Sequence, residues 1–185
     1  FGQAFRIGGA GLTLQVAMLG LDALDVLVYA AAAAMAAALG AWLQGLGLAP
    51  DARVAIMLPN VPQFGVTMAG VLRAGFTCVN VNPLYTAREL EHQLKDSGAT
   101  AIVILENFAH TLAEVIEHTP IQHVCIASLG DMLGAWYGRW ITFAVRHLAK
   151  MVPPYALALT GGRQVTPFKK ALALGRARRL QPSQA

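Results

Sequence analysis

The sequence predicts an open α/β fold, in which a mainly parallel sheet carries helices on both faces. Three observations support this prediction. Short runs of apolar and β-branched residues recur along the middle of the chain, a stretch with helical periodicity separates each run from the next, and Gly, Pro or Asn marks the turns. Strands that alternate with helices through short turns form right-handed crossovers and a parallel sheet that is covered on both faces.

Four segments are expected to be the strands of this sheet, residues 53–58, 77–81, 101–105 and 123–127. Nearly continuous apolar runs are typical of strands that are buried on both faces. A helix fits between each pair of strands. The first helix is expected to begin with Asn60 as its N-cap and to have Pro62 in its first turn. Proline has no backbone N–H, but the N–H groups of a first turn have no partner within the helix, so no hydrogen bond is lost.

The helix after the second strand has the clearest boundaries. Thr86 and Glu89 have the capping-box spacing, and Leu90 and Leu94 lie four apart on one face. Gly98 stands where a left-handed C-terminal cap is expected. We therefore predict a helix from Thr86 to about residue 97.

We expect three parts in the chain. Residues 1–50 form an opening segment with an alanine-rich helix, 51–130 form the core of strands and helices, and 131–185 form a basic helix and tail.

The 185 residues carry a formal net charge of +4, but the charges are distributed unevenly along the chain. Residues 1–130 hold five Lys and Arg against nine Asp and Glu, whereas residues 131–185 hold nine Lys and Arg against Asp131 alone. Basic tails meet phospholipid headgroups, nucleic acids or acidic protein surfaces. Aromatic residues do not alternate with these cations, so we expect no nucleic acid partner.

Residues 26–43 contain no charge in eighteen positions, long enough for a membrane span. Alanine dominates this segment, however, and contributes little to membrane insertion. We therefore favour a buried or partly exposed helix of a soluble protein over a transmembrane anchor.

Residues with reactive or metal-binding side chains form no recognisable site. Cys78 and Cys125 fall in predicted strands and are expected to be free core residues of a protein in the reducing cytoplasm. The histidines show no metal-ligand spacing, so no metal site is predicted. Thr160-Gly161-Gly162 resembles part of a phosphate-binding loop but lacks the residues that would surround a triphosphate, and we predict no catalytic residue.

Residues 135–150 are expected to form an amphipathic basic helix. Its apolar face is predicted to contain Trp140, Ile141, Ala144, Val145 and Leu148. One interpretation is an interfacial anchor on an anionic membrane, with membrane-facing candidates Arg139, Trp140, Arg146 and Lys150. The interpretation that we favour is a surface helix whose apolar face packs on the body of the protein.

One family resembles this sequence over a long run of motifs. The chain is similar to the long-chain fatty-acid CoA ligases of the adenylate-forming superfamily. The matching segments are Arg73-Ala74-Gly75, Asn80 to Thr86, Arg88 to Leu94, Lys95 to Gly98, Leu105-Glu106-Asn107-Phe108 and Lys150-Met151-Val152-Pro153.

The resemblance implies an acid–thiol ligase that uses ATP, Mg²⁺ and CoA to convert a long-chain fatty acid, through an acyl-adenylate, into its CoA thioester. In this family the loop that holds ATP follows a segment like Leu180-Gln181-Pro182. We therefore expect the chain to be the front part of such an enzyme and inactive by itself. The resemblance also implies a cytoplasmic protein, with peripheral contact at the inner membrane and a homodimer as further expectations.

The best local site candidates are Asn82, Pro83, Tyr85 and Arg88, where the second strand ends and the next helix begins. In one interpretation, these residues shape the acyl-binding side of the site or form a subunit contact. In the other interpretation, which we favour, their role is structural: they cap the loop and start the helix. Two other functions stay open: a standalone α/β binding module, and a small membrane protein anchored through residues 26–43.

Overall fold

The computed structural model describes residues 22–157 and 160–181. The chain divides into two compact units, Phe1–Ala34 and Met35–Ala185. The second unit contains the whole sheet and every side chain of the candidate site. It is the unit described below.

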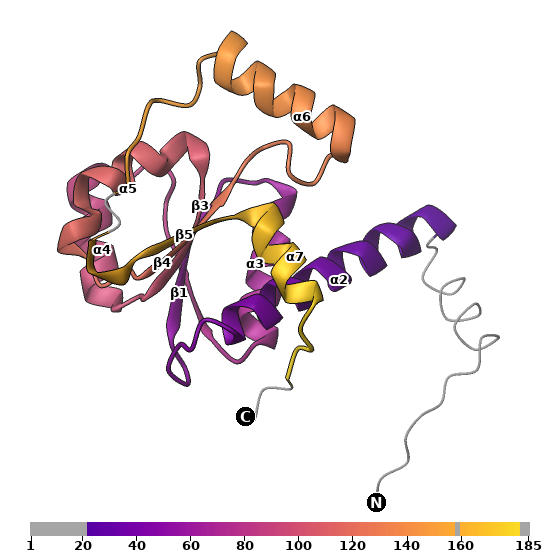
Figure 1. Cartoon of the computed structure of the whole chain (residues 1–185), viewed down its shortest axis with the longest axis horizontal. Coiled ribbons are helices and arrows are strands. Elements are labelled where there is room, and N and C mark those ends of the chain that lie inside the picture. The colour runs from indigo at the N-terminus through magenta and orange to yellow at the C-terminus, as the bar shows by residue number, and fades with distance from the viewer. Residues whose placement is uncertain (1–21, 158–159, 182–185) are drawn as a thin grey trace, which may run out of the picture. The chain divides into compact units, whose positions relative to one another are not determined.

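Five parallel strands form the central sheet (Figure 1). They are β1 (Arg53–Met57), β2 (Thr77–Asn80), β3 (Ala101–Leu105), β4 (His123–Ala127) and β5 (Gln164–Pro167), arranged in the order β2-β1-β3-β4-β5. Val54 lies opposite Cys78 on one side and Ala101 on the other, and Ile102 lies opposite Val124. The predicted parallel α/β fold and its four strands are confirmed.

Strand β5 was not among the predicted strands. Residues 164–167 belong to the segment that was predicted to be a basic tail, but Val165 and Pro167 lie opposite Val124 and Ile126 of β4. β5 is an edge strand of four residues that ends in proline. Proline is tolerated at a sheet edge, and a half-exposed edge strand lacks the long apolar run by which a buried strand is recognised.

Helices α4 (Ala87–Ser97) and α5 (Ala109–Val115) cover one face of the sheet. The capping box of α4 is present: the Thr86 amide donates to Glu89 Oε2 at 2.9 Å, and the Glu89 amide donates to Thr86 Oγ1 at 3.4 Å. Gly98 ends the helix with φ of 63°, as predicted. Two short 3-10 turns, Glu106–Phe108 and Ile116–His118, flank α5.

Helix α3 (Pro62–Arg73), helix α7 (Phe168–Arg176) and the end of α2 (Ala23–Gln44) lie on the other face (Figure 1). The predicted N-cap at Asn60 is wrong, because Val61 occupies that position without a side-chain hydrogen bond. Pro62 disfavours helical dihedrals in the residue before it. Val61 is therefore extended, at φ −118° and ψ 155°, and the helix begins at Pro62.

Helix α2 confirms the helix expected over residues 26–43. Within the described residues, α2 is long and apolar enough to cross a membrane. Its last turns are part of the core, however, where Leu39 and Leu43 are fully buried. Gly175 of α7 allows close contact there, because a Cβ at this position would lie 1.7 Å from the carbonyl oxygen of Ala38.

Helix α6 (Ala135–Phe143) continues into a π-helical turn, Ala144–Leu148, as expected for the helix predicted over 135–150. It lies beyond the carboxyl ends of the strands, apart from the two layers that cover the sheet (Figure 1). Trp140 and Leu148, predicted to pack on the protein, are instead 63% and 71% exposed. Within the described residues, the packing expected for this apolar face is therefore not seen at these two side chains.

Replacing Gly175 with Ala is expected to destabilise the protein by about 1–3 kcal/mol, because the new methyl group collides with the backbone of α2. Gly65→Ala is the matched control, since a Cβ at that helical position meets no atom within 4 Å. It should stabilise the protein by about 0.5–1 kcal/mol through helix propensity. Urea denaturation of both variants measures the two changes. Equal effects would contradict the close contact between α7 and α2.

Candidate functional site

The candidate site lies at the carboxyl edge of the sheet. Glu106 directly follows β3, Ser128 follows β4, and Phe168 begins α7 directly after β5. Open parallel sheets usually bind ligands along this edge, because loops and helix starts gather there. The polar side chains on this edge therefore define the region in which function is to be sought.

A buried ion pair joins this edge to the π-helical turn that continues α6. The Glu106 side chain is fully buried, and its Oε2 accepts hydrogen bonds from Arg146 Nε at 2.8 Å and from Arg146 Nη2. The bond to Glu106 raises the pKa of the Arg146 guanidinium above its usual value. Within the described residues, Glu106 Oε1 has no hydrogen-bond partner. Arg146 therefore provides the charge compensation that a buried carboxylate requires.

A second polar group surrounds Ser128. Gln63 Nε2 donates to the Ser128 carbonyl at 2.9 Å, and the Ser128 amide donates to Asp131 Oδ2 at 2.7 Å. Burial raises the pKa of the Asp131 carboxyl, although the Ser128 amide and Lys169 act in the opposite direction. Lys169 Nζ lies 3.6 Å from Asp131 Oδ1. These contacts tie the ends of β4 and β5 to the first turn of α3.

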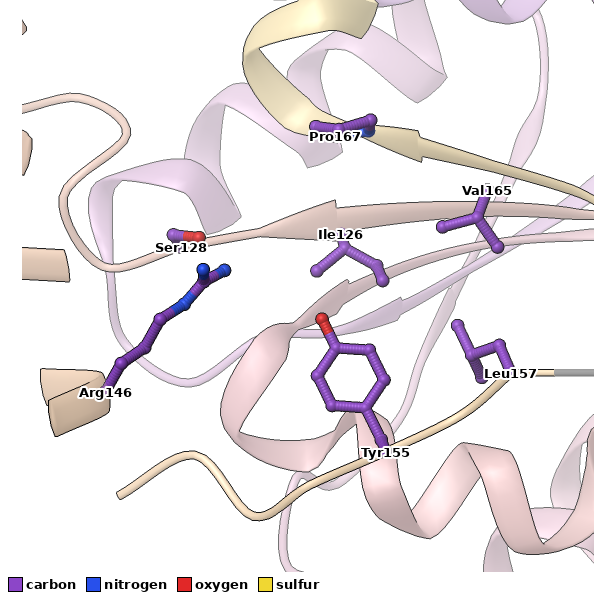
Figure 2. A pocket seen from close by; sticks show the side chains of 7 residues that line it. All are labelled: Ile126, Ser128, Arg146, Tyr155, Leu157, Val165 and Pro167. Atoms are coloured by element: carbon purple, nitrogen blue, oxygen red, sulfur yellow. The ribbon is translucent and has the colours of Figure 1, made fainter. Parts of the chain in front are cut away.

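A cavity of about 350 Å³ opens beside Arg146 (Figure 2). Its lining residues are Ile126, Ser128, Arg146, Tyr155, Leu157, Val165 and Pro167. Figure 2 shows the Arg146 guanidinium near Ser128, whereas the Tyr155 ring lies below Ile126 with its hydroxyl directed toward the strand. The walls between them are apolar.

The cavity is suited to binding an apolar group that has one polar end. Burial raises the pKa of Tyr155, and the nearby Glu106 carboxylate raises it further, so the phenol stays neutral and able to donate a hydrogen bond. The lining residues include no nucleophile that is activated by a neighbouring base. The described geometry therefore fits the binding of an apolar group that has one polar end.

The four site residues predicted after β2 lie at the opposite edge of the sheet from this cavity. The cavity is lined by residues of β4 and β5, whereas β2 is the other edge strand. Asn82 Oδ1 accepts a hydrogen bond from the Leu84 amide at 3.0 Å, and its carbonyl accepts one from the Tyr85 amide. Tyr85 packs against the core, Pro83 is half-buried, and Arg88 is exposed. These contacts shape the loop and the start of α4.

The four candidates on and after α6 have different surroundings. Trp140 is exposed, and the Arg139 guanidinium carbon lies 5.2 Å from the ring centre of Trp136. Lys150 is exposed and adopts a positive φ of 49°. Arg146, the remaining membrane-facing candidate, pairs with Glu106.

The remaining sequence motifs have structural contacts. The Thr160–Gly162 turn is held by Arg163, whose Nη1 donates to the Thr160 carbonyl at 3.0 Å and to its hydroxyl at 3.1 Å. Cys78 and Cys125 are both free, and burial raises the pKa of each thiol. Neither feature contributes to the cavity.

Sequence reasoning missed the partners that build this site. Glu106 and Arg146 are 40 residues apart, and Lys169 reaches Asp131 from another helix. Tyr155 lies in a segment without regular periodicity. Only the placement of Glu106 directly after an apolar strand could have indicated a buried carboxylate that requires a cation.

Comparison with known proteins places the chain among adenylate-forming enzymes. The family model described as AMP-binding enzyme matches residues 15–139. The long-chain-fatty-acid–CoA ligase of Salmonella typhimurium is 54% identical over 114 residues, which cover 62% of this chain and 20% of the relative. The ligase of the same name from Haemophilus influenzae is 44% identical over 126 residues, covering 68% of this chain and 22% of the relative. The chain thus spans about a fifth of these relatives.

Solved structures show the same fold. The adenylation domain of a carboxylate reductase from Mycobacterium chelonae superposes with a TM-score of 0.60 at 16% identity, over 82% of this chain and 22% of that one. A benzoate CoA ligase from Burkholderia xenovorans LB400 gives 0.52 at 21% identity, over 72% and 25%. At these identities the likeness concerns the fold alone.

Replacing Arg146 with Ala is expected to destabilise the fold by about 3 kcal/mol, because Glu106 then keeps a buried charge without a partner. Arg139→Ala, on the same helix, is the control and should change stability by less than about 0.5 kcal/mol. Adding Glu106→Gln to Arg146→Ala should recover part of the loss, since the buried group is then neutral. Urea denaturation measures all three. Equal losses for Arg146→Ala and Arg139→Ala would show that the ion pair contributes nothing.

Proposed function

Because the chain belongs to the family of AMP-binding enzymes, we propose that it is the amino-terminal part of a long-chain-fatty-acid–CoA ligase. The observation that carries this proposal is the 54% identity over 114 residues with ligases of that name. The parallel sheet supports it, because adenylate-forming enzymes of low sequence identity share the fold. In the whole protein, ATP activates the fatty acid as an acyl-adenylate, and the thiol of CoA then displaces AMP.

The described residues supply the scaffold of this reaction and not its reactive groups. No group of three or more His, Cys, Asp and Glu side chains within residues 22–157 and 160–181 could hold a metal ion. In the Thr160–Gly162 turn, the carbonyl and hydroxyl oxygens of Thr160 accept hydrogen bonds from Arg163, so this side chain holds the turn. We therefore propose that none of the described residues binds Mg²⁺, ATP or CoA.

We further assign a structural role to the loop that contains Asn82, Pro83, Tyr85 and Arg88. The hydrogen bonds of Asn82 to the Leu84 and Tyr85 amides and the capping box at Thr86 support this role. The alternative is that Tyr85 and Arg88 contact the acyl substrate or a second subunit. We also propose that the protein is cytoplasmic, makes peripheral contact with the inner membrane and forms a homodimer.

A chimeric enzyme tests the proposed function. The aligned segment of the Salmonella typhimurium ligase is replaced with that of this chain, and acyl-CoA formation from palmitate, ATP and CoA is measured. We expect kcat/KM within about tenfold of the parent, because the segment provides an equivalent scaffold. A second chimera with the Haemophilus influenzae segment is the control. A folded chimera that fails with palmitate while the control succeeds would overturn the proposal. The 185-residue chain alone should form no palmitoyl-CoA.

Replacing Tyr85 and Arg88 with Ala in the same chimera distinguishes the two roles of the loop. A structural role predicts a lower melting temperature with unchanged kcat and KM for palmitate, since Tyr85 packs against the core. A role in substrate binding predicts a raised KM for palmitate. Replacing exposed Leu84, in the same loop, provides a control for loss of an apolar side chain.

A further inference from the structure

We propose that the cavity beside Arg146 binds a neutral amphiphile, an apolar chain that ends in a hydroxyl or carbonyl oxygen, and that it excludes fatty acid anions. The apolar walls hold the chain, and the side chains of Tyr155, Ser128 and Arg146 donate to the terminal oxygen. The inference goes beyond the proposed function, because the substrate of a long-chain-fatty-acid–CoA ligase is a carboxylate. The neutral ligand therefore belongs to a second site, separate from the ligase reaction.

The walls of the cavity are continuous with the hydrophobic core. Ile126, Leu157 and Val165 are partly buried and pack against the core cluster that the sheet forms with α4 and α5. Figure 2 shows Ile126 and Val165 on the strands and Leu157 on the segment that follows α6. Apolar side chains that are fixed by the core thus enclose the cavity from more than one side. Its volume of about 350 Å³ is within the range of small-ligand sites, about 300–1,000 Å³.

Tyr155 provides a hydrogen-bond donor for the terminal oxygen. Its hydroxyl is directed toward the strand that carries Ile126, and it has no hydrogen-bond partner among the residues that the structure describes (Figure 2). Burial raises the pKa of Tyr155, and the nearby Glu106 carboxylate raises it further, so the phenol keeps its proton. A ligand oxygen in the cavity would give this donor the acceptor that the described chain does not provide.

The charge of Arg146 is already compensated by Glu106. The Glu106 Oε2 atom accepts hydrogen bonds from Arg146 Nε at 2.8 Å and from Arg146 Nη2, which leaves Nη1 for a ligand. A fatty acid carboxylate in the cavity would compete with Glu106 for one guanidinium and would place a second negative charge close to a fully buried one. A hydroxyl or carbonyl oxygen accepts from Nη1 without this repulsion.

The rest of the lining cannot compensate an anion. Among the described residues that line the cavity, Arg146 is the single cation. Lys169 lines a different hollow, where its Nζ lies 3.6 Å from Asp131 Oδ1. Transfer of a carboxylate into a largely apolar site is unfavourable unless a free cation pairs with it. Charge complementarity therefore favours a neutral polar end.

A neutral amphiphile also fits the cavity better than a purely apolar occupant. A hydrocarbon, or an apolar side chain of a partner protein, would displace water from the Tyr155 hydroxyl without accepting its hydrogen bond. The same occupant would leave the Ser128 hydroxyl without a partner. An alcohol or an ester fills the apolar part of the cavity and provides an acceptor at its polar end.

Two probes with the same chain length and different charge test the inference. Binding of 1-octanol and of octanoate to the 185-residue chain is measured by isothermal titration calorimetry at about pH 8, where octanoate is ionised. We expect 1-octanol to bind at least about tenfold more tightly than octanoate. Methyl octanoate, a neutral probe with a carbonyl oxygen, should bind like 1-octanol.

Replacing Glu106 with Gln separates charge selection from a general preference for the more apolar probe. The guanidinium of Arg146 is then free to pair with a ligand carboxylate, so the affinity for octanoate should rise about tenfold while that for 1-octanol stays within about twofold. Glu114→Gln, an equal change of charge at an exposed position of α5, should alter neither affinity. Circular dichroism checks that both variants are folded.

Replacing Tyr155 with Phe places the alcohol in the cavity. Loss of one hydrogen bond should weaken the binding of 1-octanol about fivefold and leave that of octanoate unchanged. Tyr137→Phe is the matched control, because Tyr137 is 64% exposed and does not line the cavity. It should leave both affinities unchanged.

Four results would overturn the inference. Absence of 1-octanol binding would remove the site, and equal affinities of the unchanged chain for 1-octanol and octanoate would show that charge does not select the ligand. An unchanged octanoate affinity in Glu106→Gln would show that Glu106 does not exclude anions. Equal losses in Tyr155→Phe and Tyr137→Phe would place the alcohol outside the cavity. Palmitate activity of the chimera is measured without these probes, so failure of the proposed function is recognised separately.

Discussion

The rest of the structure depends on the requirement that a parallel sheet be covered on both faces. Every residue of β3 is buried, and so are four of the five residues of β1. The helices of each layer therefore have to come close to the strands and to one another. The contact between Gly175 and Ala38 is a direct consequence, because only a residue without a side chain allows α7 to approach α2 this closely. The apolar composition of 56% serves this burial.

The same requirement determines where polar side chains occur. Within the strands, polar groups would lose water without gaining partners, so they collect where the strands end. Glu106 is an extreme case, because it directly follows β3 and is still fully buried. Its charge requires a cation, and Arg146 supplies one from a helix outside the two layers. The ion pair thereby helps to hold the π-helical turn after α6 against the protein.

These properties fit the front of a larger enzyme better than a self-contained active site. The chain spans about a fifth of the ligases that it matches, and its described residues bring together apolar walls, an ion pair and exposed aromatic rings. Reactive groups are usually carried on loops that a rigid sheet holds in place. In the proposed ligase, this segment would supply the rigid sheet.

Local and periodic features of the sequence predicted much of the fold. The four main strands, the capping box of α4 and the cap at Gly98 were recognised because each depends on residues that are neighbours along the chain. The N-cap at Asn60 was wrong because Pro62 controls the residue before it, and β5 was missed because an edge strand has no long apolar run. The family resemblance was likewise visible, because the matching motifs are defined by the order of residues along the chain.

The contacts of the candidate site, in contrast to the strands and caps, could not be predicted from the sequence. The ion pair of this site joins residues 40 positions apart, and its cavity combines residues of β4 and β5 with Tyr155 and Leu157 from the segment after α6. Arg146 was predicted as a membrane-facing candidate, because the sequence pattern could not show that it pairs with a buried carboxylate. The exposure of Trp136, Trp140 and Phe143 was equally hidden, because an apolar residue on a helix has the same sequence pattern whether it faces a core or water. The sequence by itself therefore determined four of the described strands, the caps of α4 and the family. Only the tertiary structure decided which charges meet and which aromatic side chains remain exposed, because those outcomes depend on contacts between segments that the chain order does not bring together.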